Sequence, residues 1–401
     1  MTAADAVASI QYHMGANSKS AAKSLVAAIT DIKADGPNNV VITLREGSAD
    51  FAAIMSDYHL VISPAKSDGT SDWQSGVRTG PFVYDRFTPG VSAKLKRNPN
   101  YHRSGMPYFD EVEFLALTDV AARTNALTTG ETHFMSRCDL KTVHLLKRNQ
   151  NVNVYELTGL GHYAFPMNTT VAPFDNVDVC KALKYAVDRQ DIVNKIFLGY
   201  AAVANDNPIA PSIRYAIDPL PKHVYDIDKA KFHLKQAGLS NLKVAINVAD
   251  AAFNGAVDTA VLYKEHAAKA GIDIEVVREP NDGYWDKVWL KKPWCATYWG
   301  GRVTCDWMFT TAYAEGAAWN ETFWKHPKFN QLLLQARSET DDKKRADMYA
   351  EMQQLVHDDG GAVVLVFYKY VSAHSKKLAH GRISSVFDLD GLRIAERWWL
   401  T

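Results

Sequence analysis

The sequence has few of the features that mark metal proteins, membrane proteins or nucleic-acid binders. Its four cysteines, Cys138, Cys180, Cys295 and Cys305, form no CxxC pair and no cluster with histidine at zinc spacing, which argues against a metal site. No run approaches the roughly 18 apolar residues of a membrane helix, and the mean hydropathy is -0.23. Basic and acidic residues balance at 45 each, so no bulk charge favours nucleic acid or an anionic membrane.

Motifs for catalysis are missing as well. The chain has no G-x-S-x-G elbow and no G-x-x-x-x-G-K-[ST] loop, which argues against a hydrolase nucleophile and against nucleotide hydrolysis. Gly159–Ala164 resembles half of a dinucleotide loop but lacks the third glycine. The acidic pairs Asp341-Asp342 and Asp358-Asp359 lie at expected helix ends, where capping and surface roles suffice. We therefore predict that the protein is not an enzyme and needs no cofactor.

Two features leave alternatives open. Cys295 and Cys305 could pair in an oxidising compartment, or remain two buried thiols. The first residues, Met1–Ala6, contain neither the basic nor the apolar region of a secretory signal, which taken alone favours the cytoplasm. Thr2 and Asp5 instead predict a capping box at the start of a helix.

The residues that are present favour an α/β protein. The chain has 401 residues, of which 47% are hydrophobic and 22% charged, and it is longer than single cores usually grow. Strand, helix and strand patterns at 242–248, 256–270 and 272–277 predict a right-handed βαβ unit. The run 362–368 is apolar throughout, as in a strand buried on both faces.

Shorter patterns predict the remaining elements. Alternating residues between turn signals indicate strands, and capped runs with helical spacing indicate helices. The predicted strands are 29–34, 40–44, 82–87, 91–97 and 112–117. The predicted helices are 120–129, a helix capped by Asp175 or Asn176 that ends near Gly199, and a helix capped by Asp341 or Asp342 that runs through Val356.

Three segments together carry a family resemblance. They are TGPFVYDRFTPGVSAKLKRNPNYHRSGMPYFDEVEF at 79–114, FPMNTTVAPFDNVDVCKALKYAVDRQDIV at 165–193, and the segment that begins HPKFNQLLLQARSETDDKKRADMY at 326. Their order and spacing resemble the family 5 extracellular solute-binding proteins of bacterial ABC importers, within the oligopeptide/dipeptide-binding branch. Cys180 stands where that family usually has arginine, and Arg78 stands where it usually has glycine.

The resemblance implies a fold and a division into lobes. We expect the two-lobed periplasmic-binding-protein fold of type II, an α/β fold of the large peptide-binder branch with a hinge between its lobes. Lobe one would comprise 1–167 plus 371–401 and lobe two 168–370, with crossings near 166–170 and 368–373. Relatives have a secretion signal and opening strands before a similar helix start, so the resemblance implies that this chain lacks its N-terminal part.

Candidate ligand-binding residues come first from an aromatic-rich segment between Tyr284 and Trp324. Clefts that bury small molecules favour aromatic walls. Core packing is the better explanation for any single residue, but the cluster as a whole is denser than packing requires. The candidates from this segment are Trp285, Trp299, Trp307 and Trp319.

Two charged residues lie in the same segment. Peptide-binding relatives have a similar tryptophan loop whose aspartate pairs with the peptide ammonium, but the nearest residue here is Arg302. A guanidinium binds a carboxylate with two hydrogen bonds, so Arg302 favours an anionic ligand group if it faces the cleft. The alternative is that Arg302 is an exposed arginine of a loop. Asp306 could replace the missing aspartate as the amine partner. His162 and Tyr163, near the first crossing, and Tyr58, in an apolar segment, are further candidates, with packing as the alternative.

The resemblance implies a function in transport. We expect a periplasmic protein, monomeric, that captures a peptide or similar small polar solute and docks on the permease subunits of an ABC transporter in the inner membrane. It would bind no nucleic acid and no metal. One alternative is a binder of a non-peptide, carboxylate-bearing solute such as an opine or sugar acid. Another is a truncated product without transport activity.

Overall fold

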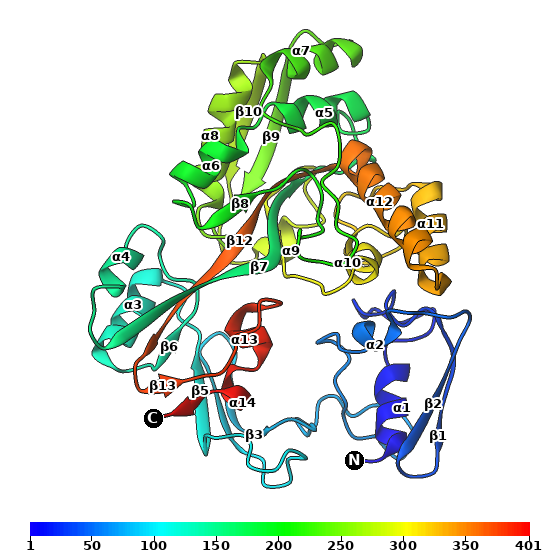
Figure 1. Cartoon of the computed structure of the whole chain (residues 1–401), viewed down its shortest axis with the longest axis vertical. Helices are drawn as coiled ribbons and strands as arrows, with labels where there is room; N and C mark the ends of the chain where they lie inside the picture. Colours follow the sequence, from blue (N-terminus) through cyan, green and yellow to red (C-terminus); the bar gives the residue numbers. More distant parts are fainter. The chain divides into compact units, whose positions relative to one another are not determined.

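The computed structural model describes residues 1–401, and the chain forms two compact units. Unit 1 contains Met1–Gly47, Ile54–Leu157 and Tyr370–Thr401, and unit 2 contains Ser48–Ala53 and Thr158–Lys369. The strands β7 (Val152–Pro166) and β12 (Ala362–Ser375) run without interruption from one unit into the other (Figure 1). One boundary between the units lies inside β7, between Leu157 and Thr158. Because the strand continues through this point, no local sequence signal marks it. The crossings near 166–170 and 368–373 stay predictions.

Unit 1 is built from short elements. Its helices are α1 (Ala3–Gln11), α3 (Val120–Thr129), α4 (Val143–Leu146), α13 (Asp388–Leu392) and α14 (Ile394–Arg397). Its strands are β1 (Ile29–Asp35), β2 (Asn39–Leu44), β3 (Phe82–Thr88), β4 (Ser92–Arg97), β5 (Glu111–Leu115), β6 (Phe134–Met135), β13 (Leu378–Ala379) and β14 (Trp399–Leu400).

The predicted local signals of unit 1 are confirmed. The backbone N–H of Thr2 donates to the Asp5 carboxylate at 2.5 Å, which completes the capping box of α1. The helix α3 ends at Gly130, whose φ of +83° lies in the left-handed region that favours glycine. β1 and β2 pair antiparallel, and β3, β4 and β5 form an antiparallel sheet.

Unit 2 contains the longest helices as well as several short ones. Its helices are α5 (Val177–Tyr185), α6 (Arg189–Lys195), α7 (Ile227–Gln236), α8 (Ala256–Ala268), α9 (Tyr284–Lys287), α10 (Cys305–Ala312), α11 (Pro327–Ser338) and α12 (Asp342–Asp359), with most of the short α2 (Phe51–Ile54). Its strands, besides parts of β7 and β12, are β8 (Ala201–Val203), β9 (Leu242–Val248), β10 (Ile272–Arg278) and β11 (Thr297–Trp299).

The predicted βαβ unit is confirmed. β9 and β10 are parallel, with Leu242 opposite Ile272, and α8 connects them. The prediction of one helix from the cap at Asp175 or Asn176 to near Gly199 is wrong, because α5 ends at Tyr185 and α6 begins at Arg189. The side chain of Asp188 caps the second helix by accepting a hydrogen bond from the N–H of Asp191 at 2.9 Å.

A second sheet of unit 2 positions the predicted site residues. β11 pairs antiparallel with β7, with Trp299 opposite His162, and β12 lies on the other side of β7. Ala362–Tyr368 of β12 are buried, as the apolar run predicted. Gly161 packs so closely on the ring of Tyr368 and the carbonyl of Trp299 that any Cβ there would collide. None of the helices is both long and apolar enough to span a bilayer.

Candidate ligand-binding site

The tryptophan loop follows β11 directly and ends at the start of α10. Trp299 is the last residue of β11, and Thr304 caps α10 by accepting from the N–H of Trp307 at 3.2 Å. Gly300 and Gly301 lie between, and their carbonyl groups accept hydrogen bonds from Arg302. The loop is therefore fixed at both ends by regular structure.

Arg302 is buried, with 3% of its surface exposed. Its Nη1 donates to the carbonyls of Gly300 and Gly301 at 3.0 and 3.2 Å. Its guanidinium carbon lies 5.4 Å from the ring centroid of Trp307 and 6.0 Å from that of Trp299, within cation–π range. The alternative of an exposed loop arginine is therefore wrong.

Asp306 is fully buried in α10 and is held by Arg337 of α11. The Nε of Arg337 lies 3.0 and 3.3 Å from the two carboxylate oxygens, and Thr310 donates to one of them at 2.9 Å. Burial raises the pKa of Asp306, and the charge of Arg337 offsets part of that effect. This ion pair joins two helices, so a role in amine binding would require a ligand to compete with Arg337.

A buried carboxylate that the sequence did not indicate connects two tryptophans. Glu321 accepts hydrogen bonds from the indole nitrogens of Trp289 at 2.6 Å and Trp299 at 2.7 Å. Burial raises its pKa to about 7. No local pattern marks Glu321, because its partners lie 32 and 22 positions away.

Further aromatic rings continue from these two tryptophans. Trp319 has its ring centroid 6.0 Å from both Trp289 and Trp299, and Trp285 lies 5.9 Å from Trp289 and 5.5 Å from Tyr298. Trp285 and Tyr298 are exposed, at 37% and 36%. We call this set, Trp285, Trp289, Tyr298, Trp299 and Trp319, the aromatic wall. Its exposed end makes it suitable for ligand contact, whereas Trp307 is buried in α10.

His162 and Tyr163 belong to β7, opposite the aromatic wall in register. His162 is completely buried, and neither ring nitrogen has a hydrogen-bond partner. Burial, and secondly the charge of Arg302, lowers its pKa to about 3. Tyr163 is stacked between Phe253 and Tyr368, with centroid distances of 4.2 and 4.5 Å.

Tyr58 is the one predicted site residue that belongs to unit 1; the others lie in unit 2. It is 42% exposed. Its ring lies 4.1 Å from His59 and 5.6 Å from Phe387. Within unit 1 these contacts form a small aromatic cluster, and the role of Tyr58 in ligand binding stays a prediction.

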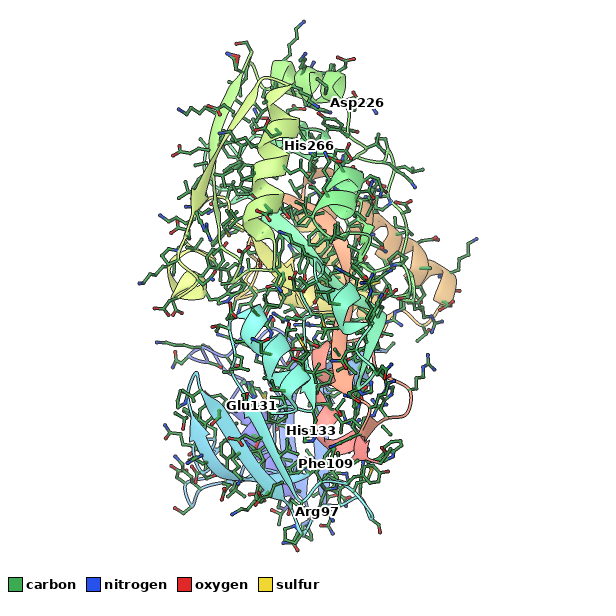
Figure 2. All side chains as sticks on the ribbon, turned by 90° about the vertical axis from the view of Figure 1, so that its left-hand side faces the viewer. Arg97, Phe109, Glu131, His133, Asp226 and His266 are labelled. Atoms are coloured by element: carbon green, nitrogen blue, oxygen red, sulfur yellow. The ribbon has the colours of Figure 1, made fainter.

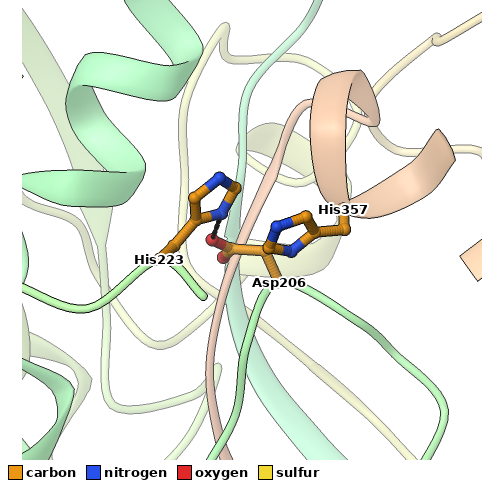
Figure 3. Close-up of side chains that lie close together, drawn as sticks. All are labelled: Asp206, His223 and His357. Atoms are coloured by element: carbon orange, nitrogen blue, oxygen red, sulfur yellow. Dashed lines mark hydrogen bonds and ion pairs between the residues drawn. The ribbon is translucent and has the colours of Figure 1, made fainter. Parts of the chain in front are cut away.

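A second cluster in unit 2 has side chains that could in principle bind a metal. Asp206, His223 and His357 are buried, and their donor atoms lie within 4.8 Å of one another (Figure 3). The Nδ1 of His223 is 2.7 Å from Asp206 Oδ2. Arg189 Nη2 lies 2.7 and 2.8 Å from the two oxygens of the same carboxylate.

The hydrogen bonds of this cluster do not fit a metal ion. Arg189 already supplies the positive charge beside Asp206, and the N–H of Val364 donates to the same carboxylate at 2.8 Å. Both ring nitrogens of His357 face backbone carbonyls, those of Asn205 at 2.8 Å and Pro221 at 3.0 Å. Burial raises the pKa of Asp206, but Arg189 and His223 outweigh it and hold that pKa well below its usual range. We interpret the cluster as a structural charge network.

Unit 1 contains a cavity of about 540 Å³. Edge strands β5 and β6 both contribute to its lining, and Phe109, Glu131 and His133 lie around it (Figure 2). Trp398 lines it as well, and packs against Leu378 and Ile394 in the core of unit 1. None of the predicted site residues lines this cavity.

The four cysteines are buried and free, so the two open alternatives for Cys295 and Cys305 resolve in favour of buried thiols. Burial raises the pKa of Cys180 to about 11 and that of Cys138 to about 12. Thiols that remain protonated at neutral pH are poor nucleophiles and poor metal ligands.

Comparison with known proteins assigns the chain to a family. The family model of the bacterial extracellular solute-binding proteins, family 5, matches residues 1–321. The chain belongs to this family. Its members are solute-binding proteins, and the predicted recognition is confirmed.

The relatives include the glutathione-binding protein of Shigella dysenteriae serotype 1 (strain Sd197), with 27% identity over 366 residues, 87% of this chain and 71% of the relative. The periplasmic binding protein DppA from Helicobacter pylori, in complex with the peptide STSA, has a TM-score of 0.87 at 24% identity and covers 100% of this chain and 82% of its own. AgaA from A. tumefaciens R10, in complex with agropinic acid, has a TM-score of 0.88 at 22% identity, with 100% and 83% covered. The predicted fold class is confirmed.

Proposed function

We propose that this protein binds a peptide, or a polar solute of similar size, and delivers it to the permease subunits of an ABC importer in the inner membrane. Membership of the solute-binding family supports the transport role, and the family is extracellular, which supports a periplasmic location. The similar proteins named above include a glutathione-binding protein and a protein in complex with a tetrapeptide.

The observation that supports this ligand class is the buried guanidinium of Arg302, which lies in the loop after β11 and close to the indoles of Trp299 and Trp307. A guanidinium matches a carboxylate with two parallel hydrogen bonds. We therefore propose that Arg302 binds a carboxylate of the solute and that the aromatic wall contacts its apolar part. Peptides have such a carboxylate at their C-terminus.

One observation favours a second ligand class. Asp306, the candidate amine partner, is already paired with Arg337. A solute with a carboxylate but no ammonium, such as an opine or sugar acid, needs only Arg302. AgaA, which has a similar fold, is known in complex with agropinic acid.

Calorimetry on Arg302 variants tests the proposal. The panel contains glutathione, Ser-Thr-Ser-Ala, its C-terminal amide, and agropinic acid. A charge-assisted hydrogen bond contributes about 1.5–3 kcal/mol, so Arg302→Ala should weaken binding of the acids roughly ten- to a hundredfold. The amide should bind the wild type as weakly as the free peptide binds Arg302→Ala, because each change removes the ion pair between Arg302 and the C-terminal carboxylate of the peptide.

The controls separate loss of the site from loss of the fold. Arg302→Lys keeps the charge without the planar fork, and should weaken binding less than alanine does. Arg278→Ala removes an exposed arginine of β10 and should leave the affinity unchanged. Unchanged affinity in Arg302→Ala would place Arg302 outside the site, and no binding by any member of the panel would contradict the proposed ligand class.

A further inference from the structure

Glu321 joins two tryptophans that come from different parts of unit 2. Trp289 lies just after α9, Trp299 ends β11, and Glu321 lies in the segment between α10 and α11. The two indole N–H groups donate to different oxygens of one carboxylate, Oε2 at 2.6 Å and Oε1 at 2.7 Å. Glu321 is 8% exposed. A single side chain therefore fixes the orientation of two rings of the aromatic wall.

We propose that Glu321 is a positioning residue: its ionised carboxylate holds Trp289 and Trp299 in place, and protonation releases this hold. The inference deepens the proposed function, because Trp299 belongs to the proposed ligand site. The affinity for the ligand would then depend on the pH around the protein.

The chemistry of the three side chains explains why ionisation matters. An indole can only donate, so each ring needs an acceptor oxygen. The ionised carboxylate offers two acceptor oxygens and makes charge-assisted hydrogen bonds, which are stronger than neutral ones. The protonated acid has one hydroxyl that must donate, and the side chain of Thr297, which hydrogen-bonds to Glu321, is its available acceptor. Protonation therefore weakens the bonds to both indoles.

The surroundings of Glu321 place its ionisation near neutral pH. Burial is the main influence and raises its pKa to about 7, while the hydrogen bonds from Trp289, Trp299 and Thr297 work in the opposite direction. Neutral donors replace the cation that usually accompanies a buried carboxylate. In the protein without ligand, the carboxylate is thus ionised above about pH 7 and protonated below it.

The other titratable groups that face Glu321 remain neutral over this range. Tyr284, Cys295 and Tyr313 interact electrostatically with it, and burial raises the pKa of each far above neutral. His162, opposite Trp299 in the sheet, has its pKa lowered to about 3. Among the groups that face the two indoles, Glu321 is therefore the one expected to titrate between about pH 5 and about pH 9.

Indole NMR resonances measure this directly on the whole protein without ligand. The chain has ten tryptophans, and the variants Trp289→Phe and Trp299→Phe assign the two relevant signals. We expect both indole proton shifts to move upfield on acidification, with a common midpoint near pH 7. If neither signal moves over this range, the proposal is wrong, and this result depends on no substitution at Glu321.

Substitution then identifies the group that titrates. Glu321→Gln has the same shape but offers a single acceptor oxygen, so one indole signal should lie upfield at every pH and the midpoint should disappear. Glu315→Gln removes an exposed carboxylate of the same connecting segment, which pairs with Lys325, and should keep the midpoint. An unchanged midpoint in Glu321→Gln would assign the titration to another residue and overturn the proposal.

Calorimetry with the probes named above separates this inference from the proposed function. If both hold, the affinity of the wild type for Ser-Thr-Ser-Ala or agropinic acid falls severalfold between about pH 8 and about pH 6, because the pKa of Glu321 lies between them at about 7. The variant Glu321→Gln should then show no such dependence on pH. If no probe binds while the indole signals titrate, the ligand proposal fails and the positioning role of Glu321 stands. Binding that is equally tight at both pH values would show that the hold on the two indoles has no consequence for the ligand and would overturn the deepened function.

Discussion

In unit 2, residues Ala362–Tyr368 of β12 are all buried, whereas in unit 1 β3 has no buried residue. Tyr84 and Phe87 of β3 are 54% and 55% exposed. Both strands contain β-branched and aromatic residues that favour strands, so strand propensity does not explain their difference in burial. What differs is the packing on their faces, and local stability follows buried contacts rather than strand pattern.

One ion pair from each unit shows a similar contrast. In unit 1, Lys96 pairs with Asp85 across the sheet at 2.7 Å, and both side chains are partly exposed. In unit 2, Arg189 pairs with Asp206 with almost no exposure of either. Exposed pairs contribute about 0–1 kcal/mol, whereas breaking a buried pair is strongly destabilising. We therefore expect unit 2 to be the more stable half.

The largest expected effect comes from breaking the charge network of unit 2. Asp206→Ala leaves Arg189 buried without its partner, which should lower the free energy of unfolding by about 3–5 kcal/mol. Urea unfolding measures this, with Asp228→Ala, which changes an exposed residue of α7, as the control. A loss below about 1 kcal/mol, the range of surface pairs, would contradict the difference between the units.

The same network predicts a pH dependence. Burial raises the pKa of Asp206, but Arg189 and His223 outweigh it, so the folded pKa lies below the ordinary value. Its ionised form therefore stabilises the protein above about pH 4 and loses this contribution as the pH falls through the folded pKa. The stability gap between wild type and Asp206→Asn should narrow on acidification.

A pair of apolar substitutions tests the packing difference. Ile246 of β9 is completely buried, and Val83 of β3 is 43% exposed. Ile246→Ala should cost about 2–5 kcal/mol because it leaves a cavity, whereas Val83→Ala should remain within about 0.5 kcal/mol. Equal losses in urea unfolding would show that β3 is buried in solution.

The smallest expected difference concerns local opening. Hydrogen exchange should be roughly ten- to a hundredfold slower in 242–278 and 362–368 than in 82–115, which corresponds to about 1.4–2.7 kcal/mol. The edge of β5 beside the cavity should exchange fastest, because edge strands present unpaired backbone groups. Equal protection in residues 1–160 and 175–365 would contradict the expected weakness of unit 1.

Local patterns in the sequence determined most of the secondary structure and the family. The βαβ pattern at 242–277, the capping box of Thr2 and Asp5, and the turn residues of the hairpins all act within a few positions, so the sequence displays them directly. The prediction of a single helix ending near Gly199 failed because a local cap, that of Asp188, competes with helical spacing.

Only the tertiary structure decided what the charged residues do. The sequence marked Arg302 and Asp306 as candidates, but burial of Arg302 beside two indoles and the pairing of Asp306 with Arg337 depend on how α10, α11 and β11 pack. Glu321 had no sequence signal at all. Hydrogen bonds of this kind join residues tens of positions apart, and the cost of burying a charge appears only once the chain has folded around it.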